Sequence, residues 1–168
     1  MTRPPLPANT GRACASGGHP PTNTRMNQRT TPPEVILLPP GLLRPTEEFS
    51  PERLEALTAE ILASGHWPFP ILVERSSLVV MDGHHRREFA LRHALRRVPC
   101  LMLDYRDVVL ESRRPGIDVT PDDVIARGLA GRPFPPKSTR HTLRCAPPPL
   151  GSWRLEALRA VDLQAAIG

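Results

Sequence analysis

Five consecutive residues, Asp82-Gly83-His84-His85-Arg86, combine groups that are suited to binding phosphate. They follow the apolar segment Leu78–Met81 and precede a helical pattern, which predicts a turn from a strand into a helix. The first N–H groups of a helix attract anions, and Gly83 lacks the Cβ that would obstruct an approaching phosphate. Arg86 adds a planar fork that matches phosphate oxygens. We therefore predict a phosphate site here; the alternative is an ordinary turn in which Asp82 caps the helix.

The remaining side chains of this turn refine the prediction. Asp82 would place a carboxylate beside a bound anion, which suits a site that also holds a metal ion or a reacting hydroxyl. Neighbouring helical positions point about 100° apart, so one ion cannot easily bind both His84 and His85. We predict polar contacts from the histidines to phosphate or ribose, and a purely structural role for one of the two is favoured still more. No metal site made of protein side chains is predicted.

A second basic segment, Lys137-Ser138-Thr139-Arg140-His141, follows the proline-rich turn of residues 132–136. Lys137 is the single lysine of the chain, and lysine is a mobile point charge whereas arginine is a rigid fork. Lys137, Thr139 and Arg140 after a stiff turn would form a clamp for an oxyanion. The alternative is a solvated basic turn.

The elements that must position these residues follow from hydrophobic periodicity and punctuation. The predicted strands are Glu34–Leu38, Ile71–Glu74 paired with Leu78–Met81 as a hairpin, and Val98–Tyr105. The predicted helices run from Pro51, capped by Ser50, to a stop at Gly65, and then over His84–Leu95, Thr120–Ala130 and Trp153–Ala166. The expected buried positions of the first two helices are Leu54, Leu57, Ile61 and Leu62, and then Ala90, Leu91, Ala94 and Leu95. This order predicts an α/β (α+β) fold with a small mixed sheet flanked by helices.

Composition separates a tail from a folded domain. Residues 1–33 are rich in Pro, Thr, Gly and Asn and carry four arginines and no acid, so we expect a disordered basic tail with Met26 as a second candidate start. Residues 34–168, the expected catalytic domain, hold 18 basic and 17 acidic residues. A nearly neutral domain argues against nucleic acid as the partner.

Location is predicted from what the sequence lacks. There is no apolar run of 18 or more residues, and no apolar stretch follows the N-terminal arginines. The three cysteines, Cys14, Cys100 and Cys145, are widely spaced and form neither a zinc pattern nor a disulfide framework. We therefore expect a cytoplasmic protein without a membrane partner.

Together these features resemble the ParB/sulfiredoxin-like fold and, within it, the free L-serine kinases, which transfer a phosphoryl group from ADP or ATP to serine. The resemblance covers roughly residues 34–160. It rests on three separated segments, Arg44-Pro45-Thr46-Glu47, Asp82–Arg86 and Phe134–His141. The third segment matters most, because relatives with other activities lack it.

The resemblance implies a role for each matching residue. Glu47 would be the base for the serine hydroxyl, with Glu48 as the alternative register, and Asp82 would also be catalytic. Gly83, His84, His85 and Arg86 would hold the phosphates of ADP or ATP, with Mg²⁺ as cofactor. The substrate or the transferred phosphate would contact the late segment, Lys137, Ser138, Thr139, Arg140 and His141.

The implied product is O-phospho-L-serine, which would link the chain to cysteine or siderophore-precursor biosynthesis, and the implied assembly is a monomer or homodimer. This chain departs from the longer kinases of the family, which carry an insertion between Tyr105 and the late segment. Contacts that come from that insertion have no counterpart here, so serine and a similar small alcohol both remain candidate acceptors.

Three other functions are compared with the kinase. A ParB-like nucleotide-binding, DNA-associated protein carries a Gly-Glu-Arg-Arg type box and a downstream helix-turn-helix domain, whereas this chain has Gly-His-His-Arg at residues 83–86 and little helical sequence after it. A sulfiredoxin-like reductase needs a cysteine at the motif, where His84 and His85 stand instead. A non-catalytic nucleotide sensor remains the third alternative.

Overall fold

The computed structural model describes residues 32–116, 118–148 and 150–160. All of them belong to one compact unit, Thr31–Gly168. The predicted tail lies outside the described residues, apart from Pro32 and Pro33. The predicted domain and tail boundaries therefore stay predictions.

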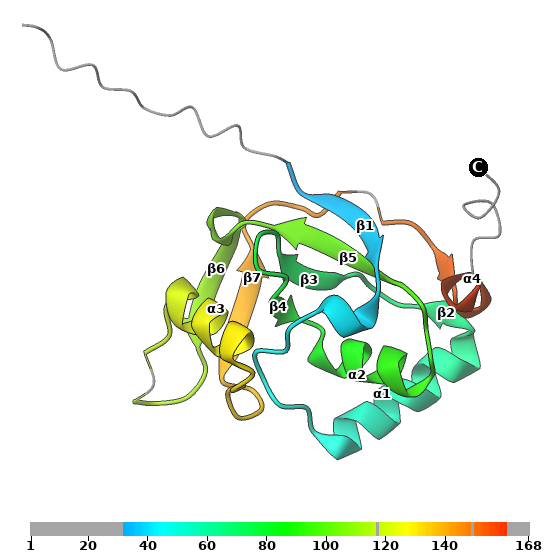
Figure 1. Cartoon of the computed structure of the whole chain (residues 1–168), viewed down its shortest axis with the longest axis horizontal. Helices are drawn as coiled ribbons and strands as arrows, with labels where there is room; N and C mark the ends of the chain where they lie inside the picture. The colour runs from blue at the N-terminus through cyan, green and yellow to red at the C-terminus, as the bar shows by residue number, and fades with distance from the viewer. Residues whose placement is uncertain (1–31, 117, 149, 161–168) are drawn as a thin grey trace, which may run out of the picture. The chain divides into compact units, whose positions relative to one another are not determined.

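The central element is a four-stranded mixed sheet in the order β1-β5-β3-β4 (Figure 1). Its strands are β1 (Glu34–Leu38), β3 (Ile71–Glu74), β4 (Val80–Asp82) and β5 (Val98–Leu103). β5 runs antiparallel to β1 and parallel to β3, and β3 and β4 form the predicted hairpin. Every residue of β5 is buried, as expected for a strand covered on both faces. The predicted fold class, a small mixed sheet with flanking helices, is confirmed.

Helix α1 (Pro51–Ser64) begins and ends where the sequence predicts. The Ser50 side chain accepts a hydrogen bond from Arg53 N at 3.3 Å, which satisfies one of the free N–H groups of the first turn. Gly65 ends the helix with φ +68°, a left-handed conformation that favours glycine. The buried stripe is narrower than predicted, because the Leu62 side chain is 47% exposed.

Helix α2 (His84–Arg92) is shorter than the predicted His84–Leu95. The chain leaves the helix after Arg92, and Ala94 adopts a left-handed conformation with φ +53°. Leu95 is still buried because the chain turns back, with Leu95 N donating to Ala90 O at 2.9 Å. Leu91 was predicted on the buried face, but its side chain is exposed.

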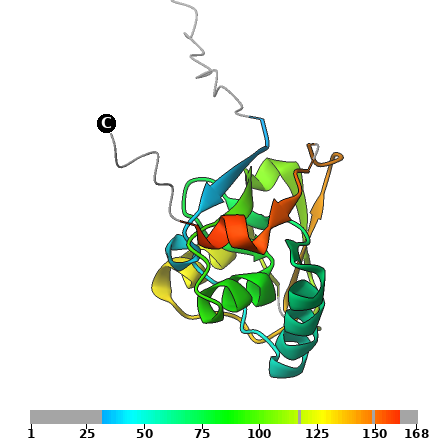
Figure 2. The ribbon, with the colours of Figure 1, turned by 90° about the vertical axis from the view of Figure 1, so that its right-hand side faces the viewer.

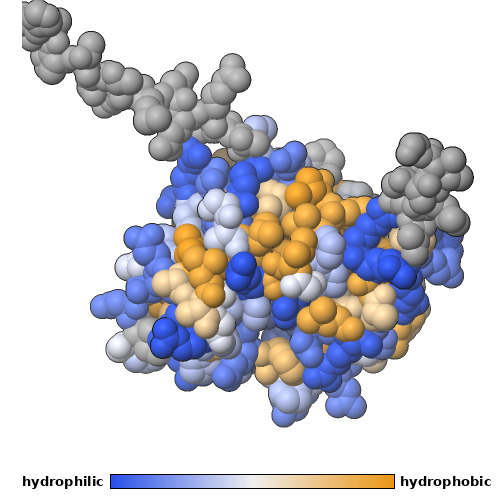
Figure 3. All heavy atoms as spheres, in the orientation of Figure 1, coloured by the Kyte–Doolittle hydropathy of each residue, from blue (hydrophilic) through white to orange (hydrophobic). Residues whose placement is uncertain are grey.

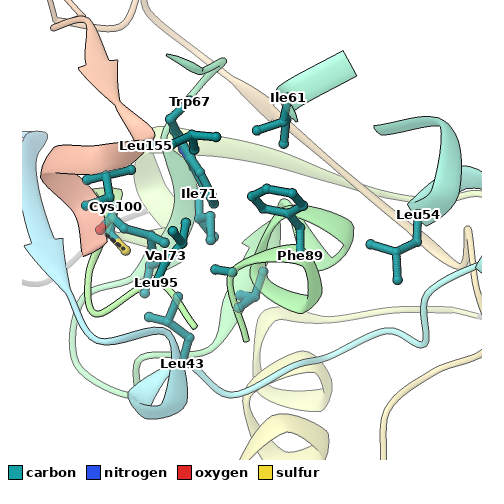
Figure 4. Packing of buried hydrophobic residues seen from close by; sticks show 14 of the residues in the cluster. Leu43, Leu54, Ile61, Trp67, Ile71, Val73, Phe89, Leu95, Cys100 and Leu155 are labelled. Atoms are coloured by element: carbon teal, nitrogen blue, oxygen red, sulfur yellow. Dashed lines mark hydrogen bonds between the residues drawn. The ribbon is translucent and has the colours of Figure 1, made fainter. Parts of the chain in front are cut away.

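The main core lies between the sheet and helices α1 and α2 (Figure 4). Phe89 of α2 is buried with Leu54 and Ile61 of α1 and with Ile71 and Val73 of β3. Helix α4 (Leu155–Arg159) closes the core beside the end of α2 (Figure 2) and accepts a hydrogen bond from Arg96 N at Leu158 O, 3.0 Å. The helix that begins the phosphate-site turn is thus fixed by apolar packing on several sides.

The segment after β5 contains strands that the sequence did not predict. A 3₁₀ turn, Tyr105–Asp107, replaces the predicted end of β5, and β6 (Val108–Ser112) then pairs antiparallel with β7 (Thr139–Leu143). Helix α3 (Pro121–Ala130) lies between them with the capping box at Thr120 and Asp123 that the sequence predicts. β2 (His66–Trp67) pairs with β8 (Trp153–Arg154), the start of the predicted last helix. The end of that predicted helix, residues 161–166, lies outside the described residues.

No helix within the described residues has the length and apolar character needed to cross a membrane. Apolar surface is visible over β1 and the 3₁₀ turn η1 (Pro40–Leu42) in Figure 3, where Leu37 and Leu42 are exposed. Cys100 is buried in β5 and Cys145 is exposed, and both of these described cysteines are free thiols.

Candidate active site

The loop Arg44–Glu48 is held between two segments that are distant in the sequence. On one side, Arg44 N donates to Leu78 O at 2.9 Å, and Val80 N donates to Arg44 O at 2.8 Å. On the other side, Phe134 N donates to Thr46 O at 2.8 Å, and Glu48 N donates to Phe134 O at 2.9 Å. The three segments that carry the predicted site residues therefore meet in the fold.

The carboxylate of Glu47 is bound by the late segment. Its Oε1 accepts hydrogen bonds from Thr139 N and Thr139 Oγ1, each at 2.5 Å, and its Oε2 accepts one from Lys137 N at 3.1 Å. A carboxylate offers about four acceptor positions, so one position on Oε2 has no partner among the described residues. The neighbouring residue Glu48 is exposed. The structure thus brings Glu47, rather than Glu48, to the late segment.

The backbone of the late segment is shaped to make these contacts. Lys137 has φ +59°, a left-handed conformation uncommon for a residue with a side chain. This turn aims Lys137 N and Thr139 N at the same carboxylate. Ser138, a predicted substrate contact, is buried and its Oγ donates to Pro135 O at 2.8 Å. In this structure Ser138 stabilises the turn rather than facing a ligand.

The first histidine of the turn binds the Glu47 loop. His84 Nε2 lies 3.1 Å from Thr46 N, 3.1 Å from Glu47 N and 3.0 Å from Thr46 Oγ1. Thr46 Oγ1 itself donates to Val80 O at 2.7 Å. Burial lowers the pKa of His84 to about 3, and the charge of Asp82 opposes this shift only in part.

The second histidine binds the same loop further along. His85 Nε2 accepts a hydrogen bond from Ser50 N at 3.1 Å, at the residue that caps α1. Burial lowers the pKa of His85, and the nearby charge of Arg53 lowers it further. Both Nε2 atoms, predicted to face phosphate or ribose, are therefore occupied by backbone N–H groups of residues 46–50.

Arg86, predicted to grip phosphate, is directed into the protein. Its Nη1 donates to Phe69 O at 2.8 Å and to Pro70 O at 2.7 Å, and its Nη2 donates to Asp82 Oδ2 at 2.7 Å. The side chain is 14% exposed, whereas that of Asp82 is 61% exposed. The fork that the sequence assigns to a ligand therefore joins the turn to the segment before β3.

The structure gives Gly83 a reason to be glycine in addition to the predicted approach of a phosphate. Its φ of +104° is accessible to glycine, and a Cβ there would lie 3.0 Å from Arg86 Nη2. The guanidinium thus lies where a side chain at position 83 would be. No side chain of the described residues caps α2, and its first-turn N–H groups have no partner within the helix. These uncapped groups are the part of the turn at which an anion site is predicted.

The strand β7 divides the rest of the predicted clamp. Alternation along a strand places Thr139 and His141 on one face and Arg140 on the other, where Arg140 is exposed. His141 Nε2 lies 3.4 Å from Tyr105 Oη, and His141 Nδ1 has no hydrogen-bond partner among the described residues. Burial lowers the pKa of His141 to about 4. The clamp predicted from Lys137, Thr139 and Arg140 is therefore split, with Arg140 away from Glu47.

Two residues near the site were missed. Arg53 lies in the first turn of α1, close enough for its charge to lower the pKa of His85, yet in the sequence it resembles any exposed helical arginine. Gly128 lets α3 approach the loop, since a Cβ there would lie 2.6 Å from Val79 Cγ1 and 3.1 Å from Thr46 Cγ2. A glycine inside a predicted helix was a signal of close packing that could have been used.

The described residues contain no group of three or more His, Cys, Asp or Glu side chains that could hold a metal ion. Magnesium commonly binds through one or two carboxylates together with substrate phosphates. The exposed carboxylate of Asp82 beside the start of α2 fits that mode of binding.

No family model matches the chain. An ATP-dependent L-serine kinase from Desulfurococcus mucosus is 32% identical over 106 residues, which cover 57% of this chain and 42% of that protein. A ParB-like protein from Sulfolobus acidocaldarius is 36% identical over 66 residues, covering 39% of this chain and 33% of that protein. The chain spans less than half the length of the curated relatives that it matches.

Among solved structures, a free serine kinase in complex with AMP superposes with a TM-score of 0.65 at 16% identity, over 74% of this chain and 93% of that chain. The fold is that of the free serine kinases. The resemblance predicted from the sequence, to free serine kinases of the ParB-like superfamily, is confirmed.

Proposed function

We propose that this chain is a kinase that transfers the terminal phosphoryl group of ADP or ATP to the hydroxyl of free L-serine, giving O-phospho-L-serine. The observation that carries the proposal is the Glu47 carboxylate, held by Lys137 N, Thr139 N and Thr139 Oγ1 with one acceptor position open on Oε2. A loop carboxylate held so firmly, and connected through His84 to an anion-binding helix start, is suited to act as a base. The relatives named ATP-dependent L-serine kinase support serine as the proposed acceptor.

The chemistry follows from these positions. A serine hydroxyl is a poor nucleophile at neutral pH, so a positioned base should accept its proton as the bond to phosphorus forms. The open position on Glu47 Oε2 accepts that proton while serine Oγ bonds to the terminal phosphorus. The bond from phosphorus to the bridging oxygen breaks, and its electron pair leaves with the shortened nucleotide. A neighbouring structure of a free serine kinase carries a substitution of one glutamate by alanine and holds ADP.

The donor side uses the start of α2. Its free N–H groups attract the nucleotide phosphates, and Lys137, whose backbone N contacts Glu47, has an exposed side chain that can supply a mobile cation. Magnesium, when bound to those phosphates beside Asp82, would neutralise part of their charge. His84, His85 and Arg86 serve this site through the scaffold, since their Nε2 and guanidinium groups hold protein atoms.

Product analysis tests this function. The wild-type chain is mixed with ADP or ATP, Mg²⁺ and, separately, L-serine, L-threonine or L-homoserine, and phosphorus NMR follows the new phosphate ester. We expect a phosphoserine signal that depends on both nucleotide and serine. Ester formation only with another alcohol would replace serine as the acceptor, and no ester with any of them would refute the kinase proposal.

A second candidate has one observation in its favour, the match to a ParB-like protein over 66 residues. In that case the chain would bind a nucleotide and DNA without transferring phosphate. The two functions differ in a direct binding assay: a DNA-associated protein should bind duplex DNA with an affinity that changes on adding nucleotide. If the chain forms phosphoserine and does not bind duplex DNA, only the kinase function is supported.

A further inference from the structure

We propose that His84 is the positioning residue of the catalytic base, and that it fixes Glu47 to the start of α2 by accepting backbone N–H groups. The inference rests on the proposed function for its kinetic consequence but not for its structural content. His84 belongs to the turn that would bind the donor phosphates, and its Nε2 reaches the two residues, Thr46 and Glu47, that carry the base. One imidazole ring thus sets the distance between the donor side and the acceptor side.

The contacts of Nε2 decide how this ring is protonated. The N–H groups of Thr46 and Glu47 both point at Nε2 from 3.1 Å. A proton on Nε2 would meet both of these protons, so Nε2 must carry its lone pair and the ring proton must sit on Nδ1. The hydroxyl proton of Thr46 is donated to Val80 O, so it does not compete with the two N–H groups for the lone pair of His84 Nε2. The ring is therefore a neutral acceptor.

The surroundings keep the ring neutral. Burial lowers its pKa, and the charges of His141, His85 and Arg87 act in the same direction, while Asp82 acts against it. A neutral ring adds no charge beside the phosphates and does not attract the carboxylate of Glu47. Glu47 is then free to be held by Thr139 and Lys137 N–H groups, which come from the opposite side of the loop. The base is fixed by its backbone to α2 and by its carboxylate to the late segment.

Two substitutions separate this role from general support of the fold. Glutamine places a carbonyl oxygen close to the position of Nε2, so His84→Gln should retain the acceptor, whereas His84→Leu fills the space without one. We expect His84→Leu to lower kcat about 10²-fold, because small displacements of a reacting group cost rates of that order. Nucleotide Kd should change less than about threefold, since the main-chain N–H groups of α2 remain. His84→Gln should recover most of the lost kcat.

The test combines NMR spectroscopy, hydrogen exchange and kinetics on the full chain. Long-range ¹H–¹⁵N spectra of the wild-type imidazoles should show His84 as the neutral ring protonated at Nδ1. The amide protons of Thr46 and Glu47 should exchange about 10- to 100-fold faster in His84→Leu than in wild type, and slowly again in His84→Gln. His66→Gln, at an exposed histidine remote from the site, is the control and should match wild type in every measurement.

The outcomes separate this inference from the proposed function. A His84 ring protonated at Nε2, or unchanged amide exchange in a folded His84→Leu, would overturn it whatever the activity. If the exchange and tautomer results appear as expected but wild type phosphorylates no acceptor, the positioning of Glu47 stands and the kinase proposal fails. If wild type is active and His84→Leu retains its full kcat despite faster exchange, His84 does not position the base.

Discussion

The two segments that meet at Glu47 are built in opposite ways. In Asp82–Arg86 the side chains of His84, His85 and Arg86 are used to hold the protein together, and the helix-start N–H groups are left for a ligand. In Lys137–Thr139 the backbone N–H groups are used to hold Glu47, and the side chain of Lys137 is left exposed. The difference teaches that side chains predicted to contact a ligand can be used by the protein itself, so that residue type alone does not decide which partner they bind.

The largest effect should come from acid, through the histidines of the site. His84 and His141 have folded pKa values of about 3 and about 4, below the unfolded value of about 6.5, so the unfolded chain binds protons first as the pH falls. Their stabilising contribution is complete above pH 6.5 and is lost below it. We expect the free energy of unfolding to fall by about 2 kcal/mol for each between pH 7 and pH 5.

Urea unfolding at the two pH values measures this loss, and the same experiment on His84→Gln isolates one histidine. The variant should lose about half of the decrease, because glutamine does not titrate. An unchanged decrease would show that His84 binds its proton as readily folded as unfolded, which contradicts a scaffold role for that ring.

The next effect concerns Arg86. Arg86→Ala removes two hydrogen bonds to backbone carbonyls and the ion pair with Asp82. A hydrogen bond from a charged donor contributes about 1.5–3 kcal/mol, and the contributions of bonds from one group do not add in full. We expect the free energy of unfolding to fall by about 3 kcal/mol, measured in urea. Arg92→Ala, on the same helix, removes a pair with Glu88 and a contact of the guanidinium with the Phe49 ring, and should cost about 1 kcal/mol.

Calorimetry with ADP and ATP then sharpens the comparison. If Arg86 only supports the turn, a folded Arg86→Ala should lose little nucleotide affinity under conditions where it remains native. A loss of nucleotide affinity of about tenfold or more, with an unchanged free energy of unfolding, would show that Arg86 contacts the phosphate, as the sequence alone predicts.

A smaller effect is expected at Gly83. Gly83→Ala forces a side chain into φ +104° and against the Arg86 guanidinium, and strain of this kind costs about 1–3 kcal/mol. We expect a loss of about 2 kcal/mol in urea unfolding. Gly41→Ala is the matched control, because nothing lies within 4 Å of a Cβ there. Equal stability of the two variants would mean that Gly83 is not held in this conformation.

The smallest effects distinguish residues within the late segment. Lys137 lies beside Glu47, whereas Arg140 is on the opposite face of β7, so Lys137→Ala should lower kcat/KM for serine about tenfold and Arg140→Ala less than about threefold. Steady-state kinetics at saturating nucleotide measures both. A larger loss in Arg140→Ala would restore the clamp predicted from the sequence and would place the acceptor on the other face of the strand.

Local signals in the sequence predicted the elements well where they were self-contained. Ser50, Pro51 and Gly65 define α1, and Thr120 with Asp123 starts α3, because caps are built from neighbouring residues. The strands β6 and β7 were missed because β6 is short and β7, Thr139–Leu143, is largely polar, and the two become strands by pairing with each other. The pairing comes from distant parts of the chain, and no period within either segment reveals it.

The site shows the same division. The sequence predicted that three separated segments carry the site, and the structure brings these segments together around Glu47. It could not show that His84 and His85 accept N–H groups from residues 35 to 38 positions away, because that depends on how the loop is held. Residue type gives the chemistry available to a side chain, and tertiary contacts decide whether a ligand or the protein uses it.

The central claim is that Glu47 is the base for phosphoryl transfer to serine, and one pair of variants tests it most directly. Glu47→Gln keeps the size and removes the basicity, while Glu48→Gln makes the same change at the exposed neighbour. Measured as phosphoserine formed per enzyme at saturating ATP and serine, kcat should fall at least about 10²-fold in Glu47→Gln and stay near wild type in Glu48→Gln. Full activity of Glu47→Gln would contradict the account.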